Sequence, residues 1–167
     1  MSRLKIEIEQ ERPFAGPEEE ALLNLMRSSD CLERAFARKI RPWGVTSTQY
    51  NVLRILRGAR PEGLTCAAIG RRMIAAEPDI TRLLARLKAR KLVGQRRDRQ
   101  DRRVVWTQIS AAGLVLLQAM DPVVLRAPGE LLGHMSATEL AELSRLLELA
   151  RRGGTGGESG AGCEEKP

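Results

Sequence analysis

Arginine and lysine side chains are concentrated in one stretch of this chain, between Arg82 and Arg103. The stretch holds ten Arg and Lys residues and two Asp, a net charge of +8, whereas the whole 167-residue chain has a net charge of +7. A diffuse excess of positive charge would indicate only solubility, whereas a focused one favours a polyanion as partner. A solvated helix face followed by a charged loop is the alternative, because charge runs are common on protein surfaces.

The residues around these arginines predict a helix followed by a β-hairpin. Glu77-Pro78 is a favourable helix start, because Pro fits the first turn and acidic side chains favour the positive end of the helix dipole. Leu92-Val93 predicts a short strand, residues 96–103 a charged hairpin tip, and the β-branched run 104–109 the returning strand. The predicted helix carries one apolar stripe at i, i+3, i+4 and i+7, formed by Ile80, Leu83, Leu84 and Leu87.

Two further helices are predicted before the basic one. A capping box, Thr46-Ser47-Thr48-Gln49, predicts a helix to about Arg57. Thr65 is the expected cap of a short helix from Cys66 to about Met73. A short helix, a tight turn and a basic helix followed by a hairpin form a winged helix-turn-helix. In such a unit the second helix enters a major groove about 12 Å wide, and Arg at the wing tip suits the negative potential of the minor groove.

Long apolar helices are predicted on both sides of this lobe. One covers residues 18–41, and others cover residues 110–152, opened by Ser110 and by a second capping box from Ser136 to Glu139. Their apolar residues exceed what the surface of a monomer needs, which favours a second copy of the chain as partner. The alternative is that they close a core within one chain.

The fold class predicted is therefore mainly α with a small β-wing. A winged helix-turn-helix lobe at about 46–109 lies between N- and C-terminal dimerisation helices, in one domain that covers residues 18–152. Residues 1–17 are expected to form a flexible arm with a short extended piece at Leu4–Ile8, and residues 153–167 a disordered Gly-rich tail. Pro122 predicts a kink or a break near Met120, because proline lacks the amide hydrogen that a helix interior requires.

Composition argues against several other classes of protein. One His and three scattered Cys provide no zinc set, no CxxC and no disulfide framework, so we expect no metal and no cofactor. A catalytic Ser/His/Asp set and a Gly-rich phosphate loop are both missing, so we expect no enzyme. No run of about 18 apolar residues predicts a membrane span, and the N-terminus lacks the apolar core of a signal peptide, which favours a cytoplasmic protein.

Three motifs together resemble the multiple-antibiotic-resistance-regulator (MarR) family of winged-helix transcription regulators. The resemblance covers about residues 18–151. It implies a homodimer whose end helices interlock and whose two winged lobes reach successive major grooves of a pseudo-palindromic operator on double-stranded DNA. It also implies a repressor that a small-molecule effector releases, although nothing in the sequence identifies such a ligand. The motifs are Thr48-Gln49-Tyr50-Asn51-Val52-Leu53, Asp79-Ile80-Thr81-Arg82-Leu83-Leu84, and Asp98-Arg99-Gln100-Asp101-Arg102-Arg103 followed by Ser110-Ala111-Ala112-Gly113.

The basic helix supplies the first group of candidate DNA-binding residues. Arg82 and Arg86 lie off the apolar stripe and are expected to contact phosphates or guanine. Thr81 touches a base or caps locally, since Thr does both. Asp79 accepts a hydrogen bond from a cytosine amino group or supports the helix N-terminus. Thr65 binds phosphate through the N-terminus of its helix, or only caps it.

The wing supplies the second group. Arg99, Arg102 and Arg103 are expected to contact DNA, and Asp101 is expected to pair with Arg103 and to stiffen the wing, as the family pattern also implies. Trp106 is larger than the resemblance leads us to expect and is predicted to pack under the wing.

Two further positions bear on the resemblance. Lys91 stands where the family usually has Gly, so the turn after the basic helix is expected to differ. Cys31 lies on the first long helix, where some relatives sense peroxide through a cysteine. It is a redox thiol or a small core residue.

The sequence supports one leading function and two alternatives to it. The first is a dimeric, sequence-specific repressor. The second is a protein–protein adaptor that keeps the winged fold without operator binding, which a flat salt dependence would identify. The third is a thiol-based sensor that uses Cys31.

Overall fold

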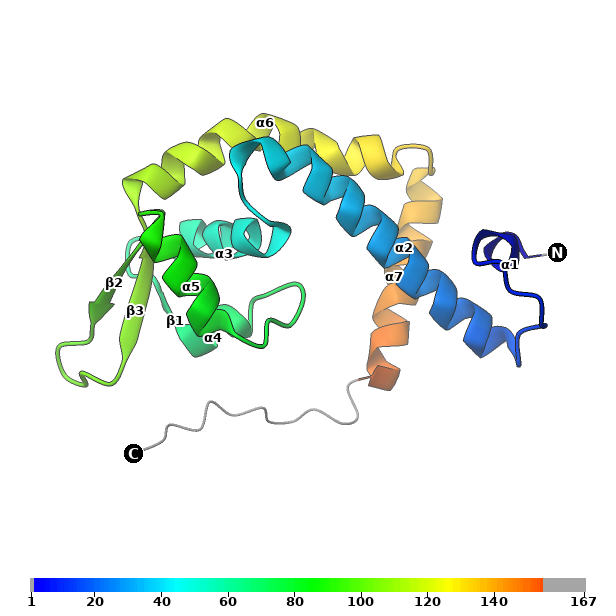
Figure 1. Cartoon of the computed structure of the whole chain (residues 1–167), viewed down its shortest axis with the longest axis horizontal. Helices are drawn as coiled ribbons and strands as arrows, with labels where there is room; N and C mark the ends of the chain where they lie inside the picture. The colour runs from blue at the N-terminus through cyan, green and yellow to red at the C-terminus, as the bar shows by residue number, and fades with distance from the viewer. Residues whose placement is uncertain (1, 155–167) are drawn as a thin grey trace. The chain divides into compact units, whose positions relative to one another are not determined.

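The computed structural model describes residues 2–154 of the chain (Figure 1). These residues form two compact units, one that ends at Ser47 and one that begins at Thr48. The described part is mostly helical with one three-stranded antiparallel sheet, which confirms the predicted fold class. The predicted tail lies outside the described residues except for Gly153 and Gly154, which still belong to the last helix.

The first unit begins with a short helix where an extended piece was predicted. Helix α1 spans Arg3–Glu7, so the extended interpretation of Leu4–Ile8 is wrong. The apolar alternation of this segment would need a partner strand, because an isolated strand leaves its backbone N–H and C=O groups unpaired. The helix pairs these groups within the segment. Leu4 is buried, whereas Ile6 is 64% exposed.

Helix α2 spans Pro17–Ile40 and is followed by a 3-10 turn, Arg41–Trp43. Its bounds agree with the predicted helix over residues 18–41 to within one residue. Pro17 occupies the first helical position and three glutamates fill the first turn, where the helix dipole favours negative charge. Gly44 ends the turn with a left-handed φ of 65°, which glycine adopts without strain.

The second unit contains the predicted helix-turn-helix and wing. Its helices are α3 (Ser47–Gly58), α4 (Cys66–Gly70) and α5 (Ile80–Ala89), and α4 lies against α5. The strands β2 (Val93–Arg97) and β3 (Val105–Ile109) form the predicted hairpin. A further strand, β1 (Leu64–Thr65), was not predicted; it pairs with β3 and gives the sheet the order β1-β3-β2.

The core of this lobe comes from one face of each element. Most residues that were predicted to point inward are buried, including Tyr50, Leu53 and Leu56 on α3, whereas Ile80 at the start of α5 is half-buried. Beside them lie Ile69 of α4, Leu83, Leu84 and Leu87 of α5, and Thr107 of β3, each less than 9% exposed. The apolar packing places α5 and the sheet, while their other faces stay in solvent.

Two long helices complete the second unit. Helix α6 spans Ala111–Leu132 without interruption, so of the kink or break predicted near Met120 the break is wrong. Met120 and Ala127, which lie on either side of Pro122, are both buried, and packing on both sides keeps the helical path through the proline. Asp121 also makes a bidentate ion pair with Arg57 of α3, with both oxygens 2.9 Å from Nη1.

Helix α7 spans Ala137–Gly154 and starts with the predicted capping box. The Glu139 carboxylate accepts the Ser136 backbone N–H at 2.8 Å, and the Ser136 hydroxyl accepts the Glu139 N–H at 3.3 Å. Among residues 2–154, only α6 is long and apolar enough to cross a membrane by length and composition.

Candidate nucleic-acid interface

Helix α5 is capped by Asp79 rather than opened at Glu77-Pro78. The Asp79 Oδ1 atom accepts the Arg82 backbone N–H at 2.8 Å, and the first helical residue is Ile80. The expected start was therefore wrong by three residues, because the carboxylate at position 79 satisfies an N–H group that the helix start leaves unpaired. The geometry is that of helix support, the second of the two roles expected for Asp79.

The two faces of α5 differ completely in composition. Leu83, Leu84 and Leu87 are buried, whereas Thr81, Arg82 and Arg86 are exposed on the other side of the helix. Residues at this spacing lie on opposite faces because an α-helix has 3.6 residues per turn. Burial of the leucines therefore holds the two arginines out in solvent.

The end of α5 is a left-handed turn at Lys91. Lys91 has a φ of 58°, its N–H donates to the Lys88 carbonyl at 2.8 Å, and the Leu92 N–H donates to the Leu87 carbonyl at 3.0 Å. These two bonds define a Schellman motif, in which glycine is the preferred left-handed residue. Leu87 and Leu92 are both buried, which supplies the apolar contact of that motif. Lys91 therefore keeps the turn that a glycine would make and accepts its strain.

The start of α6 is fastened to the same turn. The Ser110 hydroxyl donates to the Lys91 carbonyl at 2.7 Å, and the Ser110 N–H donates to the Leu92 carbonyl at 3.0 Å. A Cβ at Gly113 would collide with the Leu92 carbonyl oxygen, so only glycine allows this approach. The sequence Ser110 to Gly113 thus fixes α6 to the junction between α5 and β2.

The wing is formed by β2, β3 and the loop 98–104, and two aspartates organise its loop. Asp98 accepts the backbone N–H groups of Gln100 and Asp101 at 2.8 and 3.2 Å. Asp101 accepts the backbone N–H of Arg103 at 2.9 Å. The expected partner of Asp101 was therefore the right residue, but the contact is to its backbone amide rather than its guanidinium.

The hydrogen bonds to Asp98 also change its acidity. The Gln100 amide, followed by the Asp101 amide and the Trp106 indole, lowers the pKa of Asp98 below its ordinary value of 3.8. Hydrogen bonds to a carboxylate favour its charged form, so Asp98 is ionised at neutral pH. A negative charge thus anchors a loop whose other charged side chains are mainly arginines.

Trp106 connects this loop to the sheet. Its Nε1–H donates to Asp98 Oδ2 at 3.0 Å, and the guanidinium carbon of Arg96 lies 5.5 Å from the centre of its ring. The expectation that Trp106 packs under the wing is met in part, because the side chain is half-buried and also receives a cation on its face.

The remaining helix-turn-helix residues lie at the start of α4 and in the segment 71–79. The Thr65 hydroxyl accepts the Ala68 N–H at 3.3 Å, so Thr65 caps α4 as predicted. Cys66 Sγ lies 3.9 Å from Thr81 Oγ1, which brings the starts of α4 and α5 together. The buried Asn51 holds the segment 71–79 by accepting the Ile74 N–H at 3.2 Å.

All eight predicted DNA-binding residues are at least partly accessible, and none belongs to the core. Arg99, Arg102 and Arg103 are exposed in the wing loop, while Thr65 is half-buried at the cap of α4. Reasoning from sequence missed Asp98 and Arg96. An Asp at the start of a loop is a known turn former, which was the available signal for Asp98. The pairing of Arg96 with Trp106 required the hairpin register, which the sequence alone did not supply.

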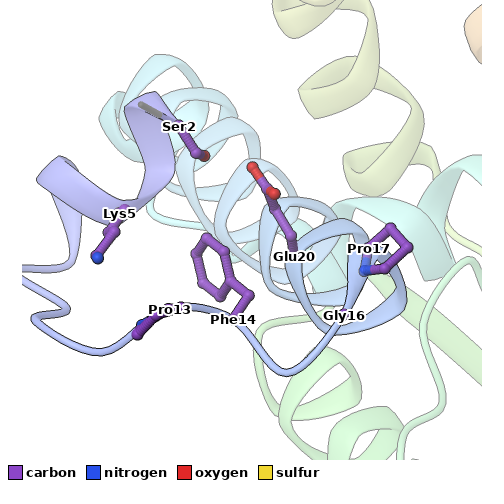
Figure 2. A pocket seen from close by; sticks show the side chains of 7 residues that line it. All are labelled: Ser2, Lys5, Pro13, Phe14, Gly16, Pro17 and Glu20. Atoms are coloured by element: carbon purple, nitrogen blue, oxygen red, sulfur yellow. The ribbon is translucent and has the colours of Figure 1, made fainter.

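Two other candidates lie in the first unit. Cys31 is exposed on α2, so within this chain its interpretation as a core residue is wrong. An open groove of about 510 Å³ lies between α1 and the start of α2, and the Phe14 ring points into it (Figure 2). Lys5 and Glu20 give it charges of both signs, unlike the enclosed, mainly apolar sites that small ligands prefer. Among the described residues, no group of three or more His, Cys, Asp or Glu is placed to hold a metal ion.

Comparison with known proteins places these features in context. Residues 43–104, from the turn before α3 to the wing loop, match the model of the MarR family. The crystal structure of a MarR transcription factor from Planctomyces limnophilus is 39% identical, with a TM-score of 0.63, and the match covers 82% of this chain and 99% of that one. A comparison with curated proteins gave no significant match.

Two more distant structures share the fold. A cysteine-to-serine mutant of MarR from E. coli, solved with operator DNA, is 22% identical with a TM-score of 0.70, covering 89% of this chain and 99% of its own. BpsR from Bordetella bronchiseptica, solved to explain how 6-hydroxynicotinic acid regulates its DNA binding, is 23% identical with a TM-score of 0.70, covering 80% and 99%.

Proposed function

The chain belongs to the MarR family of transcription regulators, and from this premise we propose that it is a dimeric repressor of a pseudo-palindromic operator. In this proposal α5 enters the major groove and the wing loop reaches the neighbouring minor groove or phosphates. Thr65, Asp79 and Thr81 support or flank the contact, and the exposed arginines make it.

One observation carries the proposal: the arginines of α5 and of the wing loop are exposed, and the leucines on the opposite face of α5 are buried. If the basic run were only a solvated surface, there would be no need for its arginines to be held in a fixed arrangement. Here the Schellman turn connects α5 directly to β2, so one hydrogen-bonded junction fixes the position of the wing relative to α5. Such an arrangement suits a duplex, whose phosphates present charge along a groove.

Dimerisation is supported by apolar side chains that one chain leaves in solvent. On α2, Leu22, Leu25 and Met26 form an exposed stripe at i, i+3 and i+4. On α6, Val115 and Leu125 are 66% and 79% exposed, and α7 exposes Leu146 and Leu149. Exposed apolar surface on three helices is expected to be covered, and a second copy covers the same surfaces on both partners.

Release by a small ligand is the remaining part of the proposal. BpsR, with the same fold, is a protein whose DNA binding 6-hydroxynicotinic acid regulates. We extend to this chain only the class of event, in which a small molecule lowers operator affinity by binding the DNA-free conformation better. A soluble, cytoplasmic location belongs to the same proposal.

Selection of bound sequences from random duplex DNA tests the function. A two-fold-related motif with half-sites about one helical turn apart, bound less tightly as salt rises, is the expected result. Light scattering on the same sample measures the mass, for which we expect twice the 18.5 kDa of one chain. No enrichment, together with flat salt dependence, would favour the adaptor.

A further inference from the structure

The sheet of the wing lobe carries three side chains side by side on one face. Trp106 on the central strand β3 lies directly opposite Arg96 on β2 and directly opposite Thr65 on β1. Residues directly opposite each other in an antiparallel pair point to the same side of the sheet. The face therefore runs from Thr65, the cap of α4, across the indole to Arg96.

The indole makes two different contacts that together fix the wing. Its ring face receives the Arg96 guanidinium at 5.5 Å, and its N–H donates to Asp98 Oδ2 at 3.0 Å. Asp98 in turn accepts the Gln100 and Asp101 amides of the wing loop. One side chain thus touches both a cation on β2 and the carboxylate that holds the loop.

A cation–π contact of this kind leaves a guanidinium able to bind phosphate. The attraction to the ring face is electrostatic and does not use a hydrogen bond, so the five N–H donors of an Arg remain available for a phosphate. An Arg held in this way loses less side-chain freedom when it binds, because its orientation is already restricted. Arg96 is exposed, so a phosphate can reach it.

We propose that Arg96 is a further DNA-contacting residue and that Trp106 is the positioning residue that holds it and the wing loop ready for the duplex. This rests on the proposed function, since it concerns how the same operator is bound. Trp106 itself needs no contact with DNA. Its effect on binding passes through Arg96 and, by way of Asp98, through the loop.

The neighbouring residue supplies a matched control. Arg97 carries the same charge one position further along β2, but it lies opposite Val105 and therefore points to the other side of the sheet. It is also exposed. A change at Arg97 alters the net charge of the wing equally without touching the Trp106 face.

The test is a double-mutant cycle on operator affinity. We expect Arg96→Ala to reduce the salt slope by about one phosphate. Trp106→Leu should weaken binding about 2- to 5-fold in the wild-type background, the range for an exposed cation–π contact. In the Arg96→Ala background its effect should be smaller, while in the Arg97→Ala background it should be unchanged. If Trp106→Leu weakens binding by the same factor in the Arg96→Ala and Arg97→Ala backgrounds, the proposal is wrong.

Three conservative variants guard against simple unfolding. Arg96→Lys keeps the charge but loses the planar group, so it should weaken binding, whereas Arg97→Lys should not. Trp106→Phe keeps a ring beneath Arg96 and should retain most of the coupling. If Arg96→Lys binds as the wild type does, the positioning role is wrong. If the wild type binds no duplex at all, the proposed function is wrong. If the wild type binds DNA but Arg96 and Trp106 show no coupling, only the present inference is wrong.

Discussion

Helix α5 and the wing loop both present arginines to solvent, but they are held in place by different forces. Helix α5 is fixed by three buried leucines beneath its exposed face. The loop 98–104 has no buried side chain and is fixed by hydrogen bonds to two aspartates. Apolar packing depends little on pH, whereas a carboxylate anchor depends on its own ionisation.

This difference separates stability from binding. Shortening a buried side chain of α5 should destabilise the lobe, because the surrounding core relaxes only partly into the space left. Damage in the wing loop should leave the fold in place and reduce DNA affinity, because exposed loops contribute little to global stability.

The largest effect is expected from the core side of α5. Leu87→Ala should lower the free energy of unfolding by about 2–5 kcal/mol, because Leu87 is fully buried and the cavity cannot collapse completely. Lys88→Ala, its exposed neighbour, should change the free energy by less than about 0.5 kcal/mol. Denaturant unfolding at one fixed protein concentration measures both. Equal losses for the two variants would contradict the packing argument.

Substitutions on the exposed side of α5 and in the wing loop should affect DNA binding differently: the first should reduce sequence specificity, and the second should reduce affinity for all sequences. Arg86→Ala should cost about 1–3 kcal/mol of operator affinity and relax specificity if the guanidinium contacts a base. Arg102→Ala should weaken all sequences alike and reduce the salt slope by about one if the guanidinium contacts a phosphate. Titration of operator and scrambled duplex over a salt series distinguishes them. If neither variant changes DNA affinity, the assignment of this surface as the DNA-binding surface is wrong.

The turn between the two regions should become more stable with the residue that the family prefers. Lys91→Gly should raise the free energy of unfolding by about 1 kcal/mol, because glycine adopts the left-handed φ of 58° without the side-chain clash. Lys88→Gly, inside α5, should lower it by about 1 kcal/mol. Thermal melts of the pair provide the comparison, and a destabilised Lys91→Gly protein would show that no strain is held there.

Repeating patterns explain which parts of the fold were predictable. Helices α2, α3 and α7 follow apolar periodicity and cap signals, so their ends agree with the sequence to within about two residues. Strand β1 has only two residues, too few for any period to appear. The path of α6 through Pro122 depends on burial on either side, which is a tertiary property that local rules do not contain.

The candidate interface shows the same division. Exposure of Arg82 and Arg86 followed from their place off the leucine stripe, and the structure agrees. The role of Asp98 did not follow, because three donors from a loop and a strand converge on it only after the hairpin register is set. Periodicity predicts which face of a helix a residue lies on, whereas hydrogen bonds between a loop and a strand can be identified only from the three-dimensional structure.

The smallest expected effect concerns the pH dependence of the wing. Since the folded pKa of Asp98 lies below its ordinary value of 3.8, the loop gains stability that is fully present above that value. This contribution is lost as the pH falls below 3.8 and through the lower folded pKa. Trp106→Phe removes one of the three donors, the third in importance, so the pKa should rise part of the way back.

Carboxyl titration by NMR measures this shift for Asp98 in the wild type and in Trp106→Phe. Glu142 is the internal control, because the Arg145 guanidinium, on the same helix α7, lowers its pKa and should do so equally in both proteins. A change at Glu142 as large as that at Asp98 would indicate a general effect of the substitution. An unchanged Asp98 would mean that the indole does not hold the carboxylate, and the hydrogen-bonded wing would then rest on backbone amides alone.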